Sequence, residues 1–303
     1  MKVLPLQLRT VTRTQGNNAA LKDGTVTPQG FAFEFEEVDP LIRAFRRMVR
    51  ELEYDVCELA ITTYLCAKEH GKPFTALPVF LVRGFHHGAI LANTKLVRGP
   101  MDLEGQRVGV NRGYTVTTGV WARGILAEEY GVDLDRVTWV LSGDEHVAEY
   151  EPPPNVVPVE PGKDVGEMVA SGELAAAVGV DVDHPDVAPL IPDAKEAGFR
   201  ALRECGHYPI NHLVVVKDEL LETHPGLAGA VFDAFERAKE LYVQGGNLEP
   251  MHARVREITG GDPLPYGVEP NRATIEALID HAVAQKILRR RPSVESLFTV
   301  GTS

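Results

Sequence analysis

The sequence predicts an α/β protein made of two lobes. Its 303 residues are more than one hydrophobic core comfortably serves. Short apolar runs alternate with segments of helical periodicity, which favours layered sheets with parallel strand pairs. The order of these segments suggests an interrupted first lobe, residues 1–83 plus 210–303, and a second lobe of residues 84–209. In such folds ligands bind in the cleft between the lobes, at strand C-terminal ends and helix N-termini.

The elements of the first lobe are predicted from periodicity along the chain. Strands are expected at residues 3–11, 31–38, 54–59, 77–82 and 213–216. Helices are expected at residues 42–52, at 60–70 and from Pro225 onward. The run at 31–38 alternates apolar and acidic residues, which indicates a strand with one face in water.

The second lobe shows the same alternation. Strands are expected at residues 89–92, 107–110, 137–141 and 175–180. A helix follows Asn111, because apolar residues fall on one of its sides and Gly131 ends it. Residues 151–155 read Glu-Pro-Pro-Pro-Asn and predict a rigid loop, since proline lacks a backbone N–H and cannot lie in a central strand.

Composition excludes several classes of protein. The net charge is −12, from 31 Lys and Arg against 43 Asp and Glu, which argues against nucleic acid as a partner. No stretch approaches the roughly 20 apolar residues that span a bilayer, so no membrane partner is expected. Pro5 and Gln7 break the short N-terminal apolar run, unlike the longer core of a signal peptide, and a cytoplasmic location is expected. The three cysteines predict no disulfide framework and no structural zinc.

The first group of candidate residues is the segment Arg83-Gly-Phe-His86-His87. Arginine is always charged and forks onto carboxylates, and histidine exchanges protons near neutral pH. Adjacent side chains of an extended segment point to opposite faces, so only one of His86 and His87 would face a given cleft. A polar surface loop is the alternative interpretation.

Two further groups lie at expected strand ends. Thr117 and Thr118 follow a strand and begin a helix, so their N–H and hydroxyl groups predict either an anion site or ordinary capping. Asn211 and His212 precede a buried strand, where a polar pair should be hydrogen-bonded, in a site or in the core. The chain contains no HExxH, GxSxG, GxGxxG or P-loop motif.

The chain resembles the 4,5-dihydroxyphthalate decarboxylase family over nearly its whole length. The matching words are Arg13-Thr14, Glu53-Tyr-Asp-Val-Cys-Glu58, Pro78-Val-Phe80, Arg83-x-Phe85-x-His87, Val120-Trp-Ala-Arg-Gly124 with Glu129-Tyr-Gly131, Pro209-Ile-x-His212 and Pro265-Tyr-Gly-Val-Glu-Pro-Asn-Arg272. The resemblance implies a two-lobed fold like that of type II periplasmic binding proteins. It also implies removal of one carboxylate from a hydroxylated aromatic dicarboxylate such as 4,5-dihydroxyphthalate, giving protocatechuate and CO2.

The resemblance also implies roles for particular residues. Substrate contacts are expected from Arg13, Arg83, His86, Thr117, Thr118, Arg123 and Asn211. Catalytic roles are expected for His87, His212 and Glu58, the two histidines as proton carriers. The partner is an aromatic carboxylate, no metal ligands are assigned and no cofactor is expected, while a divalent metal and a homo-oligomer stay open.

The sequence departs from the family pattern where a substrate would sit. His86 stands where the pattern has an arginine, Arg112-Gly113-Tyr114 replaces a Glu-Tyr pair, and Thr12 replaces an aspartate. Two other interpretations therefore stay open. One is a non-catalytic binding protein for a small or aromatic carboxylate, and the other is a different lyase on the same scaffold.

Overall fold

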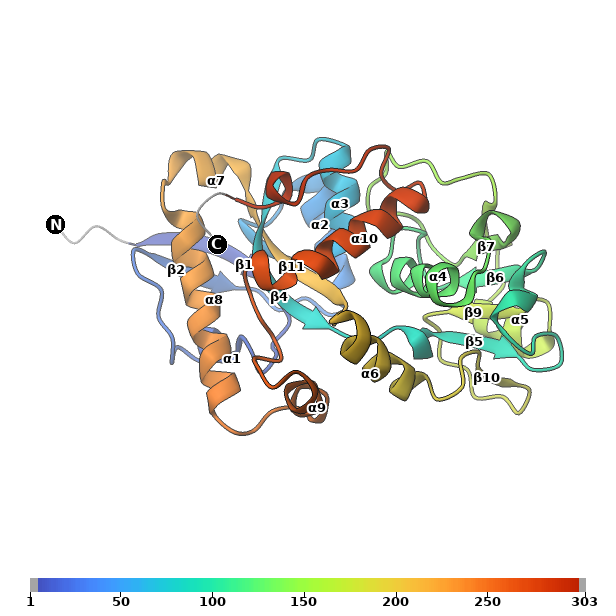
Figure 1. Ribbon diagram of the computed structural model, residues 1–303. Helices are drawn as coiled ribbons and strands as arrows, with labels where there is room; N and C mark the ends of the chain where they lie inside the picture. The colour runs from blue at the N-terminus through green and yellow to red at the C-terminus, as the bar shows by residue number, and fades with distance from the viewer. Residues whose placement is uncertain (1–4, 300–303) are drawn as a thin grey trace. The chain divides into compact units, whose positions relative to one another are not determined.

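The computed structural model describes residues 5–299, which divide into two compact units (Figure 1). Residues 5–83, 210–276 and 292–299 form the first unit. Gly84–Pro209 and Ala277–Arg291 form the second. Among the described residues, no helix is both long and apolar enough to cross a bilayer.

The first unit contains a five-stranded mixed sheet in the order β2-β1-β3-β11-β4. Its strands are β1 (Leu6–Val11), β2 (Phe31–Phe35), β3 (Val56–Ala60), β4 (Phe74–Arg83) and β11 (Ile210–Lys217). β1 pairs in parallel with β2 and β3, whereas β11 runs antiparallel to both β3 and β4. All five residues of β3 are buried, as expected of a strand covered on both faces.

The helices of the first unit lie between these strands or after them along the chain. They are α1 (Ala19–Lys22), α2 (Ile42–Glu51), α3 (Ile61–Glu69), α7 (Asp218–Thr223), α8 (Leu227–Gln244) and α9 (Pro250–Thr259), with the short 3₁₀ helices η4 (Glu269–Asn271) and η5 (Val294–Leu297). In α2 the buried residues Ala44, Phe45, Met48 and Val49 recur at three- and four-residue spacing, so one stripe of the helix faces the core.

The second unit contains a six-stranded sheet in the order β10-β5-β9-β6-β7-β8. Its strands are β5 (Ile90–Asn93), β6 (Arg107–Val110), β7 (Thr138–Leu141), β8 (Val156–Pro158), β9 (Ala176–Val178) and β10 (Val187–Pro189). Its helices are η1 (His87–Ala89), η2 (Pro100–Leu103), α4 (Thr117–Tyr130), η3 (Leu134–Arg136), α5 (Val165–Ser171) and α6 (Ala194–Cys205). β6 pairs in parallel with β7 and β9, so their C-terminal ends lie at one edge of the sheet.

One part of the predicted division is wrong. The sequence assigned residues 277–291 to the first lobe, but the structure groups them with the second unit. Helix α10 (Arg272–Ala284) crosses the boundary, and its second half packs on α4. Gln285 Nε2 donates to the carbonyl of Val120 at 2.9 Å, and the His281 ring lies where a Cβ on Gly124 would stand. Helical periodicity shows that a helix has an apolar face but not which sheet it covers.

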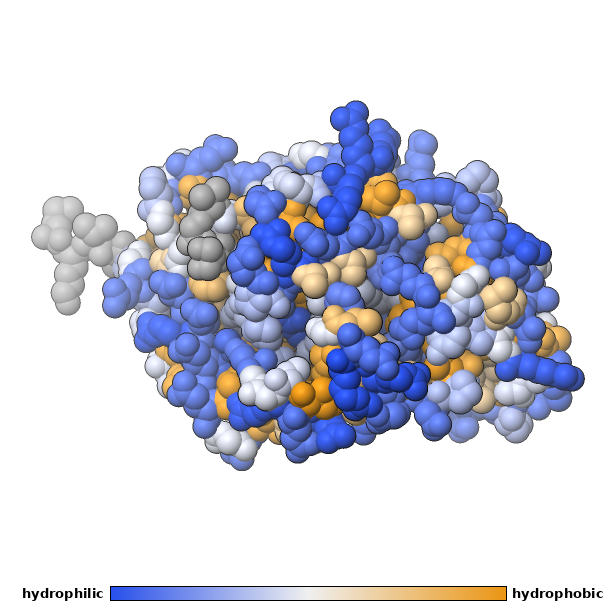
Figure 2. All heavy atoms as spheres, in the orientation of Figure 1, coloured by the Kyte–Doolittle hydropathy of each residue, from blue (hydrophilic) through white to orange (hydrophobic). Residues whose placement is uncertain are grey.

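The expected strands are otherwise present with altered ends. β1 is described from Leu6, and the predicted start at residues 3–4 lies outside the described residues. The edge strands β8 and β10 were not predicted, because each has three residues, ends in a proline and has no buried position, so neither shows the apolar run of a core strand. Figure 2 shows hydrophilic residues over most of the visible face. The large apolar side chains exposed among the described residues are Leu96, Met101 and Leu241.

Candidate functional site

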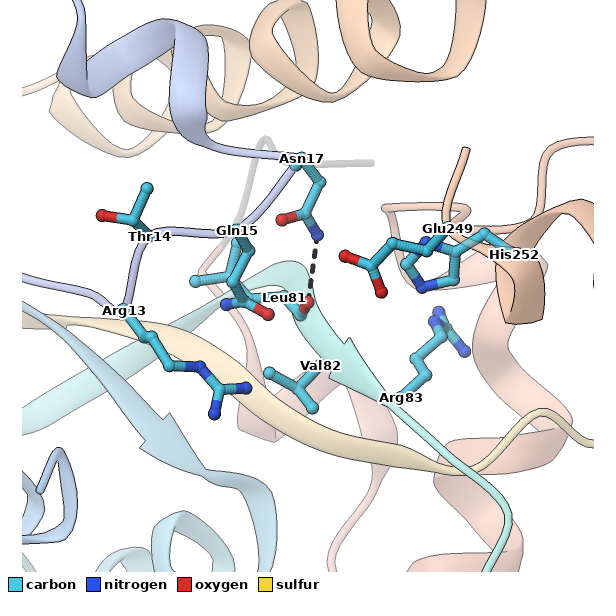
Figure 3. A pocket seen from close by; sticks show the side chains of 10 residues that line it. Arg13, Thr14, Gln15, Asn17, Leu81, Val82, Arg83, Glu249 and His252 are labelled. Atoms are coloured by element: carbon cyan, nitrogen blue, oxygen red, sulfur yellow. Dashed lines mark hydrogen bonds between the residues drawn. The ribbon is translucent and has the colours of Figure 1, made fainter. Parts of the chain in front are cut away.

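The first unit contains a cavity of about 340 Å³ at the C-terminal ends of two strands (Figure 3). The loop after β1, the end of β4 and the start of α9 form its walls. The lining residues are Arg13, Thr14, Gln15, Gly16, Asn17, Leu81, Val82, Arg83, Glu249 and His252. We call this the first-unit cavity. Two arginines against the one carboxylate of Glu249 favour an anionic ligand, since guanidinium groups bind carboxylates through charge-assisted hydrogen bonds.

Arg13 is connected to the sheet beneath it. Its backbone N–H donates to Glu58 Oε2 at 2.9 Å. Glu58 lies on β3 and is fully buried. A buried carboxylate requires hydrogen-bond partners, so this bond fixes the loop that presents the Arg13 side chain.

Glu58 also holds His212. The two residues lie on the neighbouring strands β3 and β11, and Glu58 Oε1 is 2.6 Å from His212 Nδ1. With the Glu58 carboxylate as the acceptor of this bond, Nδ1 carries the hydrogen and Nε2 is the nitrogen left to exchange a proton. The ring of Phe45 packs edge-on against the imidazole at 5.1 Å. His212 therefore has one orientation and one tautomer.

The predicted pair Asn211–His212 lies at an irregular place in the sheet. The pairing of β11 with β4 shifts register between Ile210 and His212, which pairs with Val82. Such a bulge re-aims side chains next to a site. Val82 lines the first-unit cavity, so His212 is paired across the sheet with a residue of the cavity wall.

Residues 265–271 near the C-terminus bind the side chain of Arg83. Its Nη2 donates to the carbonyl of Pro265 at 2.9 Å and to Asn271 Oδ1. Asn271 is buried, and its Nδ2 donates to the carbonyls of Pro265 at 3.0 Å and Gly267 at 2.7 Å. The orientation of the amide is therefore fixed, and residues 265–271 act as a clamp on one nitrogen of the Arg83 guanidinium.

Sequence reasoning missed two residues of this cavity, Glu249 and His252. Both come from the start of α9, about 170 residues after Arg83 in the chain. Burial lowers the pKa of His252; Glu249 opposes this effect and Arg83 adds to it. The available signal was a histidine in the first turn of a helix that begins at Pro250. From the sequence alone, this signal does not show that the helix start lies beside the ends of β1 and β4.

In the second unit, a cavity of about 180 Å³ lies at the start of α4 and the C-terminal ends of β6 and β9. It is lined by Val110, Asn111, Arg112, Val116, Thr118, Gly119, Val178 and Gly179. Thr118 is thus on a cavity wall, while Thr117 is buried beside it. No side chain caps this described helix start, so its first N–H groups suit an anion.

The loop before α4 already holds an internal carboxylate. Glu145 accepts the N–H groups of Tyr114 and Thr115, and the Thr115 hydroxyl at 2.6 Å. These donors are therefore occupied by the protein itself. The departure Arg112-Gly113-Tyr114 belongs to this loop, where Gly113 leaves room for the carboxylate of Glu145.

His87 does not share a cavity with Thr118. Its Nε2 lies 2.9 Å from Glu129 Oε1 at the far end of α4. Glu129 is eleven positions beyond Thr118 along the helix, a rise of about 17 Å. His87 lines a different, mainly apolar cavity of about 110 Å³ with Glu129. The expectation that His87 and the threonines line one site is therefore not met in this unit. His86 is buried at the start of η1.

Arg123 is held inside the second unit. The sequence placed it among the substrate contacts, and that role stays a prediction, since its side chain is completely buried. Nε donates to Gln285 Oε1 at 2.8 Å, Nη2 donates to the Tyr114 carbonyl at 2.6 Å, and the guanidinium stacks on the Tyr114 ring at 3.8 Å. Arg123 therefore binds the loop before α4 to the segment after α10. Within its unit it has no exposed surface to offer a ligand.

The structure thus brings Arg13, Glu58, Arg83, Asn211 and His212 to one region of the first unit. It places His86, His87, Thr117, Thr118 and Arg123 in the second. The predicted cleft shared by both groups stays a prediction. Among residues 5–299, no group of three or more His, Cys, Asp or Glu side chains is arranged to hold a metal ion.

Comparison with solved structures identifies the fold. The alkanesulfonate-binding protein SsuA from Xanthomonas axonopodis pv. citri superposes with a TM-score of 0.56 at 16% identity, covering 98% of this chain and 99% of that chain. SsuA from Escherichia coli gives 0.57 at 11% identity, covering 97% and 98%. The desulfurization enzyme DSZB gives 0.54 at 12% identity, covering 98% and 97%. At these identities the likeness shows the fold alone, and the predicted two-lobed periplasmic-binding-protein-like fold of type II is confirmed.

Sequence comparison identifies the family. No protein-family model matches the chain. It is 30% identical over 319 residues to a 4,5-dihydroxyphthalate decarboxylase of Comamonas testosteroni, covering 97% of this chain and 96% of that protein. It is 34% identical over 200 residues to a 4,5-dihydroxyphthalate decarboxylase of Pseudomonas putida, covering 60% of this chain and 77% of that protein. The chain therefore belongs to the 4,5-dihydroxyphthalate decarboxylase family.

Proposed function

We propose that this protein is a carboxy-lyase that removes one carboxylate from a hydroxylated aromatic dicarboxylate such as 4,5-dihydroxyphthalate. The products are protocatechuate and CO2. Family membership supports the reaction class. The structural observation that carries the proposal is the position of Arg13, whose side chain lines the first-unit cavity while its backbone N–H binds the carboxylate that orients His212.

The chemical difficulty is the electron pair left on the ring when CO2 departs. A hydroxyl para to the departing carboxylate allows the ring carbon to be protonated first, giving a dienone-like intermediate. The carbon–carbon bond to the carboxylate then breaks, and its electron pair restores the aromatic ring. One proton enters and one CO2 leaves. The substrate itself supplies the electron sink, so the residues must bind two carboxylates, give a proton to carbon, accept one from the hydroxyl, and return that one to the phenolate oxygen as CO2 leaves.

The first unit contains groups suited to these tasks. Arg13 and Arg83 serve as carboxylate ligands, each able to fork onto two oxygens. His212 serves as proton carrier, because imidazole is partly protonated near neutral pH and Glu58 keeps its Nδ1 occupied. His87 keeps its proposed role as a second proton carrier. Its partner Glu129 would orient its ring as Glu58 orients His212.

The direct test is incubation with 4,5-dihydroxyphthalate, with CO2 and protocatechuate both measured. We expect equal amounts of the two products and no turnover of phthalate, which lacks the hydroxyl that accepts the electron pair. Binding of several hydroxylated phthalates without any CO2 release would contradict the proposal. The protein would then be a carboxylate-binding protein on the same fold.

A further inference from the structure

His252 and Arg83 point toward each other on one wall of the first-unit cavity (Figure 3). A guanidinium only donates hydrogen bonds, whereas a neutral imidazole donates from one nitrogen and accepts at the other. The function of this wall therefore depends on which nitrogen of His252 carries the hydrogen.

Tyr242, on α8, determines the hydrogen position. Its hydroxyl oxygen accepts the backbone N–H of Glu249 at 2.9 Å and lies 2.9 Å from His252 Nδ1. With its oxygen engaged by a donor, the hydroxyl gives its own hydrogen to Nδ1. Burial raises the pKa of Tyr242, which keeps this hydrogen on the hydroxyl. The neutral imidazole then carries its hydrogen on Nε2.

Close packing holds Tyr242 in this place. A Cβ on Gly16 would stand 2.4, 2.7 and 2.8 Å from three atoms of the Tyr242 ring. Only glycine lets the loop after β1 pass so close to the ring. The rings of Tyr242 and His252 lie 5.8 Å apart with planes at 84°. The loop, α8 and the start of α9 therefore fix the direction of the imidazole together.

We propose that the Nε2–H of His252 and the guanidinium of Arg83 form one carboxylate subsite, and that Tyr242 is the positioning residue that fixes the imidazole in the required tautomer. The subsite rests on the proposed function, because the carboxylate is one of the two on the aromatic substrate. Two converging donors suit an anionic oxygen, since each makes a charge-assisted hydrogen bond to it. A neutral donor beside an arginine also avoids repulsion between two cations.

The tautomer is measured directly by nitrogen NMR of the imidazole rings, which needs no enzyme activity. The His252→Phe variant identifies the signal of His252 among the ten histidines. We expect the Nε2–H form in the wild type near neutral pH and a shift toward the Nδ1–H form in Tyr242→Phe. The control is Tyr54→Phe, which removes a hydroxyl bonded to Arg47 at 3.0 Å elsewhere in the unit. A wild-type Nδ1–H ring, or an unchanged ring in Tyr242→Phe, overturns the proposal.

Calorimetric binding of phthalate, a dicarboxylate without hydroxyls, tests the subsite itself. His252→Phe keeps a ring of similar shape but has no N–H, and we expect affinity to fall about 10- to 100-fold. Tyr242→Phe should give a smaller fall, and Tyr54→Phe none. Equal affinity in His252→Phe and wild type, or no phthalate binding by the wild type, overturns the subsite.

Failure of the proposed function gives a different pattern. If the wild type binds phthalate with the expected dependence on His252 but releases no CO2 from 4,5-dihydroxyphthalate, the subsite stands and the decarboxylase is rejected. If the wild type releases CO2 while His252→Phe keeps its affinity, the decarboxylase stands and the subsite is rejected.

Discussion

Glu58 and His212 form a carboxylate–imidazole pair across two antiparallel strands, with 2.6 Å between Oε1 and Nδ1; the carboxylate is fully buried and the imidazole is partly exposed. The other oxygen of Glu58 accepts the Arg13 backbone N–H. One carboxylate thus positions both the proposed proton carrier and the loop of a proposed carboxylate ligand. Each oxygen binds a different partner, so neither oxygen can be lost without disturbing one of the two.

The first prediction concerns this pair. Glu58→Gln should lower kcat roughly 100-fold, the scale of a mispositioned acid–base group, because the amide offers one acceptor where two donors are bound. Asp55→Asn is the matched control, since Asp55 also accepts a backbone N–H, that of Arg9 at 2.9 Å, but lies outside the cavity wall. Steady-state kinetics with 4,5-dihydroxyphthalate checks the result. Full kcat in Glu58→Gln would remove the pair from the mechanism.

The second prediction concerns Arg83. Arg83→Lys should lower kcat/KM about 10- to 100-fold although the charge is kept, because lysine cannot form the planar fork. Arg254→Lys on the surface of α9, where the arginine pairs with Glu257 at 2.8 Å, should leave kcat/KM unchanged. If both variants behave like the wild type, Arg83 does not contact the substrate.

The third prediction concerns Asn271, which accepts a hydrogen bond from Arg83. Asn271→Ala should raise KM and lower the free energy of unfolding by about 1–3 kcal/mol, because the buried Gly267 carbonyl loses the amide donor and the Pro265 carbonyl keeps only Arg83. In the double variant with Arg83→Lys, the rise in KM should be less than the product of the two separate effects, since Asn271 acts through Arg83. Independent effects on KM would show that Asn271 is only structural.

The fourth prediction separates Arg123 from the carboxylate ligands. Arg123→Lys should lower the melting temperature, because lysine cannot keep the hydrogen bonds to Gln285 and Tyr114 together with the stacking on the Tyr114 ring. The KM of the folded variant should stay close to that of the wild type. A raised KM with an unchanged melting temperature would restore the role that the sequence suggested.

Much of the fold was predictable because buried strands are short apolar runs, and their ends are visible in the sequence. Arg83 and His212 were singled out for this reason, since each lies at or near a strand end, whereas Arg13 was named from the family resemblance. Strand ends are where ligands bind in such architectures, and the roles of these residues stay predictions.

The remaining features depend on tertiary packing that periodicity does not encode. His252 reaches the first-unit cavity from α9, and Glu129 reaches His87 from 42 positions away. The second half of α10 packs on α4 in the second unit, which its own pattern of apolar residues does not reveal. Arg123 resembled a ligand because of its charge, whereas the structure uses it to join buried segments.

The last prediction concerns stability in acid. His281 and His207 both line the mainly apolar cavity of the second unit. Burial lowers the pKa of each ring, although Glu128 opposes this effect for both, and Asp280 also opposes it for His281. The folded pKa values therefore lie below the unfolded value of about 6.5.

Below that pH the unfolded chain binds more protons than the folded one, so the stability of the second unit is full above about pH 6.5 and falls as the pH drops toward the folded pKa values. His281→Phe keeps a ring beside Trp121 and Gly124 but does not titrate, so its melting temperature should fall less between pH 7.5 and 5.5 than that of the wild type. His224→Gln, which removes an exposed imidazole from the first unit, is the control and should follow the wild type. Calorimetric melting at the two pH values checks the result, and an equal fall in all three proteins would show that the buried imidazoles do not govern acid stability.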